Sequence, residues 1–172
     1  KARLILAEEL VRTQAFKECV DERGFIEDLN KSIVYTKQRE FEYNNNPEPA
    51  KETRLTQTSQ YQRSKKVSSN ALLKAGFLCE VNTEHPVFVR KNSNENYTEP
   101  HHLVPLFAQK DFPDVNLDRE QNIVSLCSHC HNLLHYGADI DGVLYKLYMD
   151  RKDLLQLIGI EISYEDLRKY YL

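Results

Sequence analysis

The residues best suited to bind metal ions are gathered in one part of the chain. All six histidines and three of the four cysteines lie between positions 79 and 135 of the 172-residue sequence. Imidazole nitrogens and thiolates are the groups that zinc and related transition metals prefer as protein ligands. Such a cluster indicates metal chemistry, and the spacing of its members predicts two separate sites.

The first predicted site is a closed structural one. Cys127 and Cys130 form a C-x-x-C pair, and Cys79 lies in the segment LCEVN, where a second such pair is expected. The partner position holds Asn82, a poor zinc ligand, but His85 three residues later can take its place. We therefore expect a tetrahedral structural zinc site whose ligands are Cys79, His85, Cys127 and Cys130. The alternative is that Cys79 is a buried thiol and His85 a surface residue.

The second predicted site is an open catalytic one. His101 and His102 are adjacent, and adjacent side chains of a strand point to opposite faces, so one can hold a metal while the other faces a substrate. His131 and His135 are four residues apart, which places them on one face of a helix. Three nitrogen ligands, with positions left open for phosphate and water, would come from His101, His131 and His135. His102 remains available as a general base, because imidazole titrates near neutral pH.

A C-x-x-C pair also occurs in thioredoxin-like redox proteins. That interpretation requires a βαβ context, and the sequence does not show one. A disulfide framework is not expected either, because no signal peptide is visible at the start of the sequence. We therefore expect a cytoplasmic protein whose cysteines bind metal.

The strings YTEPHHLVPL and NIVSLCSHCHNLLH resemble the HNH, or ββα-metal, nuclease family. That family includes colicin DNases, homing endonucleases and Mcr-type restriction enzymes that act on modified DNA. The preceding segment YQRSKKVSSNALLKAGFLCE resembles the Mcr-like branch, and the whole match covers residues 61–137. Asn82 departs from the family pattern, because many relatives have Cys there. The resemblance implies a ββα-metal core and a metal-dependent endonuclease that hydrolyses DNA, in restriction or phage defence.

The resemblance also assigns roles to individual residues. It implies that His101 binds the catalytic metal, that His102 activates water, and that Asn122 braces the loop bearing this base. His131 and His135 correspond to the metal ligands on the helix. The implied cofactors are a structural Zn²⁺ and a catalytic divalent ion, which is Mn²⁺, Ni²⁺, Co²⁺, Mg²⁺ or Zn²⁺. Imidazole ligands favour the transition metals over magnesium.

Glu99 and His129 lie beside the candidate ligands in the sequence. Glu99 either supports a metal ligand or is a solvated strand residue, and His129 is expected to be exposed. Six basic residues form either a phosphate-contacting patch or an ordinary solvated surface: Arg63, Lys65, Lys66, Lys74, Arg90 and Lys91. A zinc-stabilised DNA-binding module without cleavage would explain the cysteines and these basic residues equally well. It would not explain the four other histidines of the open site.

The sequence pattern around these residues predicts an α+β fold class and a chain in four parts. Residues 1–43 form a helical region, for dimerisation or docking, and residues 44–60 a polar linker. Residues 61–137 form the nuclease domain, and residues 138–172 a C-terminal extension that ends in a helix. The sequence starts with Lys rather than Met, and we expect an upstream domain that supplies specificity.

Within the last two parts the predicted elements are short. We expect strands near 87–89, 97–103 and 122–126, and helices near 70–75, 128–136 and 164–171. Ser68 or Ser69 would cap the first of these helices, and Ser163 the last. Residues 140–147 are expected to form a hairpin or an extended segment. The tyrosines of the C-terminal helix are expected in the core or an interface.

The overall charge gives no support for a nucleic-acid partner. The formal net charge is -3, whereas a basic balance is typical of nucleic-acid-binding proteins. A nuclease is not excluded, because a metal ion and a local basic patch can meet phosphate while the rest of the surface stays acidic. No apolar run approaches the ~20 residues that cross a bilayer. We expect DNA as the partner, no membrane partner, and either a homodimer or two successive nicks if both strands are cut.

Overall fold

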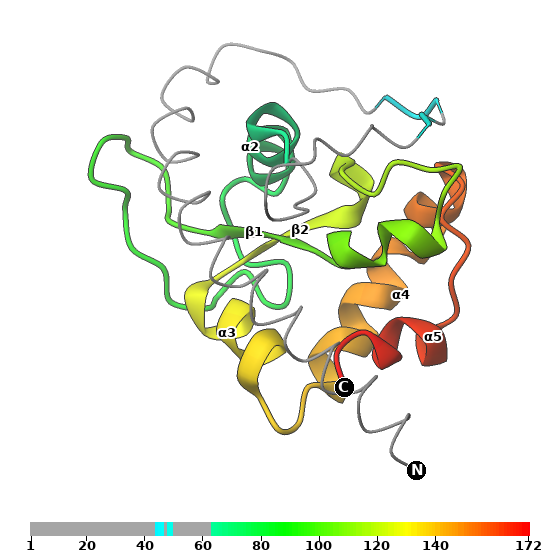
Figure 1. Cartoon of the computed structure of the whole chain (residues 1–172). Helices are drawn as coiled ribbons and strands as arrows, with labels where there is room; N and C mark the ends of the chain where they lie inside the picture. The colour runs from blue at the N-terminus through cyan, green and yellow to red at the C-terminus, as the bar shows by residue number, and fades with distance from the viewer. Residues whose placement is uncertain (1–43, 47, 50–62) are drawn as a thin grey trace, which may run out of the picture.

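The computed structural model describes residues 44–46, 48–49 and 63–172 (Figure 1). In this part of the chain, helices accompany a two-stranded antiparallel sheet. This mixture agrees with the α+β class predicted from the sequence. The helices expected within residues 1–43 and most of the expected linker 44–60 lie outside the described residues.

Helix α2 spans Lys65–Lys74 and begins earlier than the sequence predicted. Its N-cap is Ser64, whose side-chain oxygen accepts a hydrogen bond from a backbone N–H of the first turn. The prediction that Ser68 or Ser69 caps it was wrong, because both lie inside the helix and are buried. The first turn is polar, so the apolar pattern alone did not reveal it. Gly76, with a φ of 62°, follows the end of the helix in the left-handed region that favours glycine.

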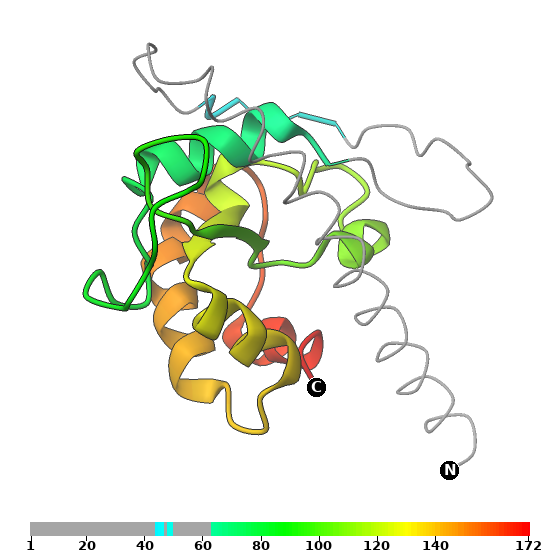
Figure 2. The same ribbon diagram turned by 90° about the vertical axis from the view of Figure 1, so that its left-hand side faces the viewer.

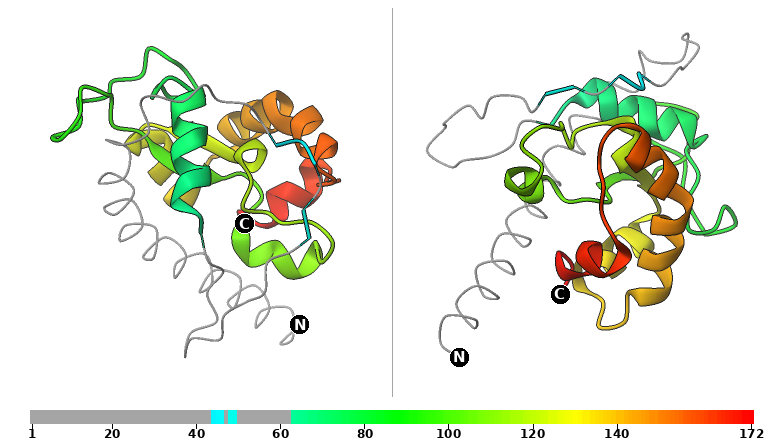
Figure 3. Two further views of the ribbon diagram at one scale, coloured as in Figure 1. Left: turned by 90° about the horizontal axis from the view of Figure 1, so that it is seen from above. Right: turned by 90° about the vertical axis from the view of Figure 1, so that its right-hand side faces the viewer.

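The sheet consists of β1, Glu99–His102, and β2, Ile123–Leu126. The strands pair antiparallel, and His102 lies opposite Ile123. Every residue of both strands is buried. Helix α2 crosses the strands on one side, and α3, Ser128–Tyr136, lies on the other (Figures 2 and 3). The strands near 97–103 and 122–126 and the helix over 128–136 were thus predicted correctly, apart from one to two residues at the strand ends.

The segments around the sheet are less regular than the strands. The strand expected near 87–89 is reduced to a single bridge between Val89 and Asn96. The long connection between β1 and β2 contains two 3₁₀ helices: η1, Leu106–Asp111, and η2, Glu120–Asn122.

Helix α4 spans Asp141–Leu157 and contradicts the prediction of a hairpin or extended segment over 140–147. Gly142 and Val143, both poor helix formers, stand in its first turn. Three leucines on one face are almost completely buried: Leu144, Leu147 and Leu155. Burying each contributes about 1.5–3 kcal/mol, whereas a glycine in a helix costs about 1 kcal/mol. Tertiary packing therefore outweighs the local preference.

Helix α5 spans Tyr164–Lys169 and begins where the sequence predicted. The Ser163 hydroxyl accepts a hydrogen bond from the Asp166 backbone nitrogen at 3.1 Å and donates one to the Asp166 carboxylate at 2.7 Å. Arg168 donates to Asp141 in the first turn of α4 at 2.6 Å. One buried core joins the sheet to α3, α4 and α5, and its members include Leu103, Val124, Leu126, Leu134, Leu144, Leu147 and Leu167. Among the described helices, none has the length and apolar character that crossing a membrane requires.

Candidate functional site

The structure brings the predicted structural ligands together. One ligand atom from each of Cys79, His85, Cys127 and Cys130 lies within 4.8 Å of every other. Nδ1 of His85 is 3.2 Å from the sulfur of Cys130 and 3.6 Å from that of Cys127. The three cysteines are buried and form no disulfide with one another. Three thiols and one imidazole at these distances could hold a structural metal ion such as zinc.

The surrounding backbone explains how these residues meet. Cys127 is the N-cap of α3, and its sulfur accepts a hydrogen bond from the backbone nitrogen of Cys130 at 3.5 Å. Cys79 reaches the pair because the next residue, Glu80, is fastened to β2. The backbone nitrogen of Glu80 donates to the Ser125 carbonyl at 2.9 Å, and the carboxylate of Glu80 accepts from the Ser125 backbone nitrogen at 2.6 Å.

Asn82 has a structural role in place of the ligand role that a cysteine would have. Its side-chain oxygen accepts a hydrogen bond from the Glu84 nitrogen at 3.0 Å, and its carbonyl accepts one from the His85 nitrogen at 3.1 Å. Asn82 thus forms a turn that returns the chain to the cysteines. This turn places His85 in the position predicted for the fourth ligand.

The three thiols affect one another's ionisation. Burial raises the pKa of Cys130, and the neighbouring thiols of Cys79 and Cys127 raise it further. Burial also acts to raise the pKa of Cys79, but backbone hydrogen bonds outweigh it and the pKa is lowered. Negative charge on several of these sulfurs at once is unfavourable unless a cation compensates for it.

The structure also brings together the three histidines predicted for the second site. One nitrogen from each of His101, His131 and His135 lies within 4.8 Å of the others. His101 comes from β1, and the other two come from successive turns of α3. The ring centroids of the three pairs are 4.8–5.2 Å apart. His101 and His131 are buried, and His135 is half-buried.

Glu99 orients one of these imidazoles. Its carboxylate lies 2.5 Å from Nδ1 of His131 and accepts a second hydrogen bond from the Ser128 hydroxyl at 2.8 Å. Burial alone would raise the pKa of Glu99, but the hydrogen bond and charge of His131 outweigh it and the pKa is lowered. Of the two roles predicted for Glu99, the structure favours support of a candidate ligand. The Nδ1 proton points to Glu99, so Nε2 of His131 is the nitrogen that could bind an ion.

Tyr171 orients a second imidazole, and the sequence did not single it out. Its hydroxyl lies 2.9 Å from Nε2 of His101 and donates a hydrogen bond to the Leu103 carbonyl at 2.7 Å. Nδ1 of His101 and Nε2 of His131 are buried and make no hydrogen bond within the described part of the chain. Buried nitrogens in this state suit a cation, so the three histidines fit a divalent metal ion.

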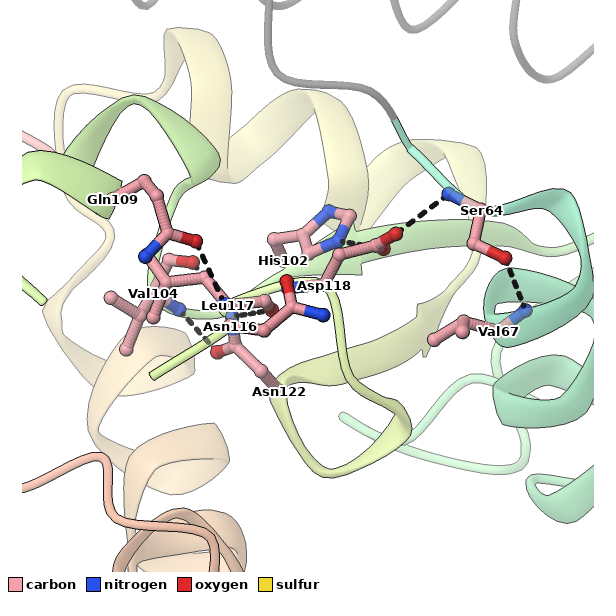
Figure 4. A network of polar contacts seen from close by, with 9 residues as sticks. All are labelled: Ser64, Val67, His102, Val104, Gln109, Asn116, Leu117, Asp118 and Asn122. Atoms are coloured by element: carbon pink, nitrogen blue, oxygen red, sulfur yellow. Dashed lines mark hydrogen bonds and ion pairs between the residues drawn. The ribbon is translucent and has the colours of Figure 1, made fainter. Parts of the chain in front are cut away.

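His102 faces away from the three histidines, as its place in the strand predicted. Its Nε2 lies 3.1 Å from Oδ1 of Asp118, and both side chains are 3% exposed (Figure 4). The other oxygen of Asp118 accepts a hydrogen bond from the Ser64 backbone nitrogen at 2.7 Å. The Asp118 nitrogen donates to the Asn116 side chain at 3.0 Å. This network links His102 to the N-terminus of α2.

Asn122 joins the two ends of the loop that bears Asp118. Its amide nitrogen donates to the carbonyls of Val104 at 2.8 Å and Leu117 at 2.9 Å. Its amide oxygen accepts from the Val104 backbone nitrogen at 2.8 Å (Figure 4). Asn122 is completely buried, so these bonds are shielded from water. These contacts brace the loop that follows β1, whereas His102, which the resemblance placed on the braced loop, lies in β1 itself.

The described residues of the expected linker lie against this same loop. The Arg119 guanidinium donates to the carbonyls of Asn46, at 2.9 Å, and Asn44. The Asn116 backbone nitrogen donates to the Glu48 carbonyl at 3.0 Å. Arg119 is 2% exposed, whereas Asn44 and Asn46 are exposed, so the contact lies at the edge of the interior. The described residues of the segment are mostly exposed, and their backbone carbonyls accept the hydrogen bonds from the loop.

The six basic residues that the sequence suggested for a phosphate-contacting patch differ in their exposure. Arg90 is buried, and its guanidinium donates to the carbonyls of Asn96 at 3.1 Å and Thr98 at 2.7 Å. The Arg90 guanidinium therefore makes its hydrogen bonds within the protein. Including Arg90 among the candidates for phosphate contact was wrong. Four of the others are exposed: Lys65, Lys66, Lys74 and Lys91. His129 is exposed, as predicted.

No protein-family model matches the chain, and no curated protein is significantly similar to it. The geometry of the described residues is therefore the basis for the functional argument.

Proposed function

We propose that this chain is an endonuclease of the HNH, or ββα-metal, class that hydrolyses DNA phosphodiester bonds with a divalent metal ion. The observation that carries the proposal is the arrangement of two adjacent histidines on β1. His101 turns to the two histidines of α3, and His102 turns to Asp118 on the opposite side. A structural metal site requires no such second set of histidines. A hydrolytic site requires both a metal-binding group and a separate proton acceptor.

Three imidazoles suit a catalytic ion better than a structural one. His101, His131 and His135 supply three ligands, so coordination positions stay open for substrate and water. A divalent ion held there would stabilise negative charge on the phosphate and on the departing oxygen. Nitrogen ligands favour manganese, cobalt, nickel or zinc over magnesium. The Cys79, His85, Cys127 and Cys130 cluster would hold a separate structural zinc.

His102 is the group that we assign to proton transfer. Asp118 accepts the Nε2 proton, so Nδ1 of His102 keeps a lone pair that can take a proton from water. The oxygen of that water then bonds to phosphorus while the bond to the 3′ oxygen breaks. The departing 3′ oxygen takes up a proton from water, so the products carry 5′-phosphate and 3′-hydroxyl ends. Nδ1 is buried, so water would reach it only when neighbouring groups move aside.

A plasmid-nicking assay tests the proposal. The chain is freed of loosely bound metal with a chelator and incubated with supercoiled DNA and Mn²⁺, and open-circular product is measured. We expect nicking by the wild type and by His129→Ala, whose histidine is exposed on the same helix but outside both clusters. We expect a large loss for His131→Ala. DNA binding without nicking, in the presence of any of Mn²⁺, Co²⁺, Ni²⁺, Mg²⁺ or Zn²⁺, would instead identify a zinc-stabilised DNA-binding module.

A role in restriction or phage defence is part of this proposal, by analogy with the proteins that the sequence resembles. The same analogy suggests that target specificity comes from segments other than the histidine site. One active centre cuts one strand, so a cut through both strands would require either a dimer or two successive nicks.

A further inference from the structure

We infer that Tyr171 is a positioning residue of the histidine metal site, because its hydroxyl holds His101 in the tautomer that binds the ion. This inference rests on the proposed metal site and extends it to the C-terminal end of the described chain. The contact joins residues that are 70 positions apart in the sequence. Tyr171 itself lies outside the segment 61–137 that resembles a nuclease.

The direction of the hydrogen bonds fixes the role of the hydroxyl. A tyrosine hydroxyl has one proton to donate. Tyr171 donates this proton to the Leu103 carbonyl at 2.7 Å. Toward Nε2 of His101, at 2.9 Å, the hydroxyl oxygen can then only accept. Nε2 of His101 therefore carries the imidazole proton, and the lone pair is on Nδ1.

This tautomer suits metal binding because a ligand nitrogen must be unprotonated. Without an acceptor at Nε2, the proton of His101 could occupy either nitrogen. The metal ion would then bind only the fraction of molecules in which Nδ1 is unprotonated. Groups that hold the second nitrogen of a metal-binding histidine typically change metal affinity by about 10- to 100-fold. Glu99 serves His131 in the same way. Two of the three candidate ligands are thus oriented before an ion arrives.

The C-terminal segment is anchored well enough to hold this hydroxyl in place. Leu167 of α5 is completely buried, and Arg168 donates to Asp141 at 2.6 Å. The ring of Tyr170 packs edge-on against Phe107, with 5.7 Å between centroids. These contacts do not involve Tyr171, so removing its hydroxyl should leave the helix docked.

Tyr170 offers a matched control. Its hydroxyl donates to the Asp111 carboxylate at 2.9 Å. This hydrogen bond is exposed and involves none of the histidines. Tyr170→Phe and Tyr171→Phe each delete one hydrogen-bonded hydroxyl and keep the ring. A purely structural role would give the two variants similar behaviour.

The test is a calorimetric titration of Co²⁺ into the full chain, with the cysteine cluster already filled by one equivalent of zinc. His131→Ala identifies which part of the heat belongs to the histidine site. We expect Tyr171→Phe to weaken Co²⁺ binding by about 10- to 100-fold, and Tyr170→Phe to bind like the wild type. In the nicking assay, Tyr171→Phe should need more Mn²⁺ for half-maximal rate and reach nearly the wild-type rate at saturation.

The outcomes separate this inference from the proposed function. Unchanged or tighter Co²⁺ binding by Tyr171→Phe, or equal weakening in both variants, overturns the role of Tyr171 while leaving the nuclease proposal intact. Weaker Co²⁺ binding by Tyr171→Phe alone supports the role, even if the wild type never nicks DNA and the nuclease proposal fails. A wild-type chain that binds no Co²⁺ at the histidines overturns both.

Discussion

Oδ1 of Asp118 lies 3.1 Å from Nε2 of His102, in an interior where both side chains are 3% exposed. The two residues are 16 positions apart, and Asp118 lies on the loop that Asn122 braces. A buried carboxylate beside an imidazole favours the tautomer that keeps its proton on the facing nitrogen. Asp118 therefore determines which nitrogen of His102 can accept a proton.

Replacing Asp118 with Asn tests this relationship. An amide can donate to Nε2 as well as accept from it, so the wrong tautomer of His102 becomes accessible and nicking should slow. We expect a loss within the range of about 10²–10⁴-fold that general-base catalysis contributes, with Co²⁺ affinity at the three histidines unchanged. Asp114→Asn, on an exposed residue of the same loop, is the control. Equal nicking rates for the two variants would contradict the assignment.

Part of the candidate metal-binding arrangement could be predicted from the sequence because four of its seven residues lie within the short segment 127–135. The spacing of Cys127, Cys130, His131 and His135 defines one short helix, and its pattern is independent of the rest of the fold. Alternation along a strand likewise separates His101 from its neighbour. Local periodicity is sufficient for predictions of this kind.

The partners of these ligands could not be predicted in the same way. Tyr171 follows α4 and α5 in the chain and contacts His101 across 70 positions of sequence. The sequence over 140–147 pointed to a hairpin or an extended segment, and the structure has part of α4 there instead. Asp118 was one carboxylate among many in a polar loop. Contacts of this kind depend on tertiary packing, which local preferences do not reveal.

The ion pair between Asp141 and Arg168 predicts a pH-dependent contribution to stability. The hydrogen bond from Arg168 lowers the pKa of Asp141, and the charge of Arg168 acts in the same direction. A carboxyl whose pKa is lower in the folded state stabilises the fold above its unfolded pKa, about 3.9. This contribution is lost as the pH falls through the folded pKa. The pair is exposed, so its contribution should be small and should decrease with added salt.

The measurement is the melting temperature of the wild type and Asp141→Asn between pH 7 and pH 3. We expect the variant to melt at a lower temperature at pH 7 and the difference to shrink as the carboxyl becomes protonated in the wild type. Asp153→Asn, on an exposed residue of the same helix, should show no such trend. A difference that grows toward low pH would refute the prediction.

The cysteine cluster predicts that zinc removal destabilises the whole described fold. The cluster ties the segment after α2 to the first turn of α3, so binding energy at this site is also folding energy. Cys130→Ser should lose one equivalent of zinc and lower the free energy of unfolding by several kcal/mol. His85→Ala should weaken zinc binding while His129→Ala does not. Retention of tightly bound zinc by His85→Ala would favour a site without this histidine, and a wild-type chain without zinc would rule out the site.

The last prediction concerns the division of roles between His101 and His102. His102→Ala should abolish most nicking but leave metal binding nearly intact, because this residue faces Asp118 and not the other histidines. His101→Ala should weaken metal binding as well, because it removes one of three candidate ligands. The two effects are separated by titrating Mn²⁺ into each variant while nicking is measured. Excess Mn²⁺ should partly restore His101→Ala and have no effect on His102→Ala. The opposite pattern would mean that the roles are reversed, and wild-type rates for both variants would place the active site elsewhere in the protein.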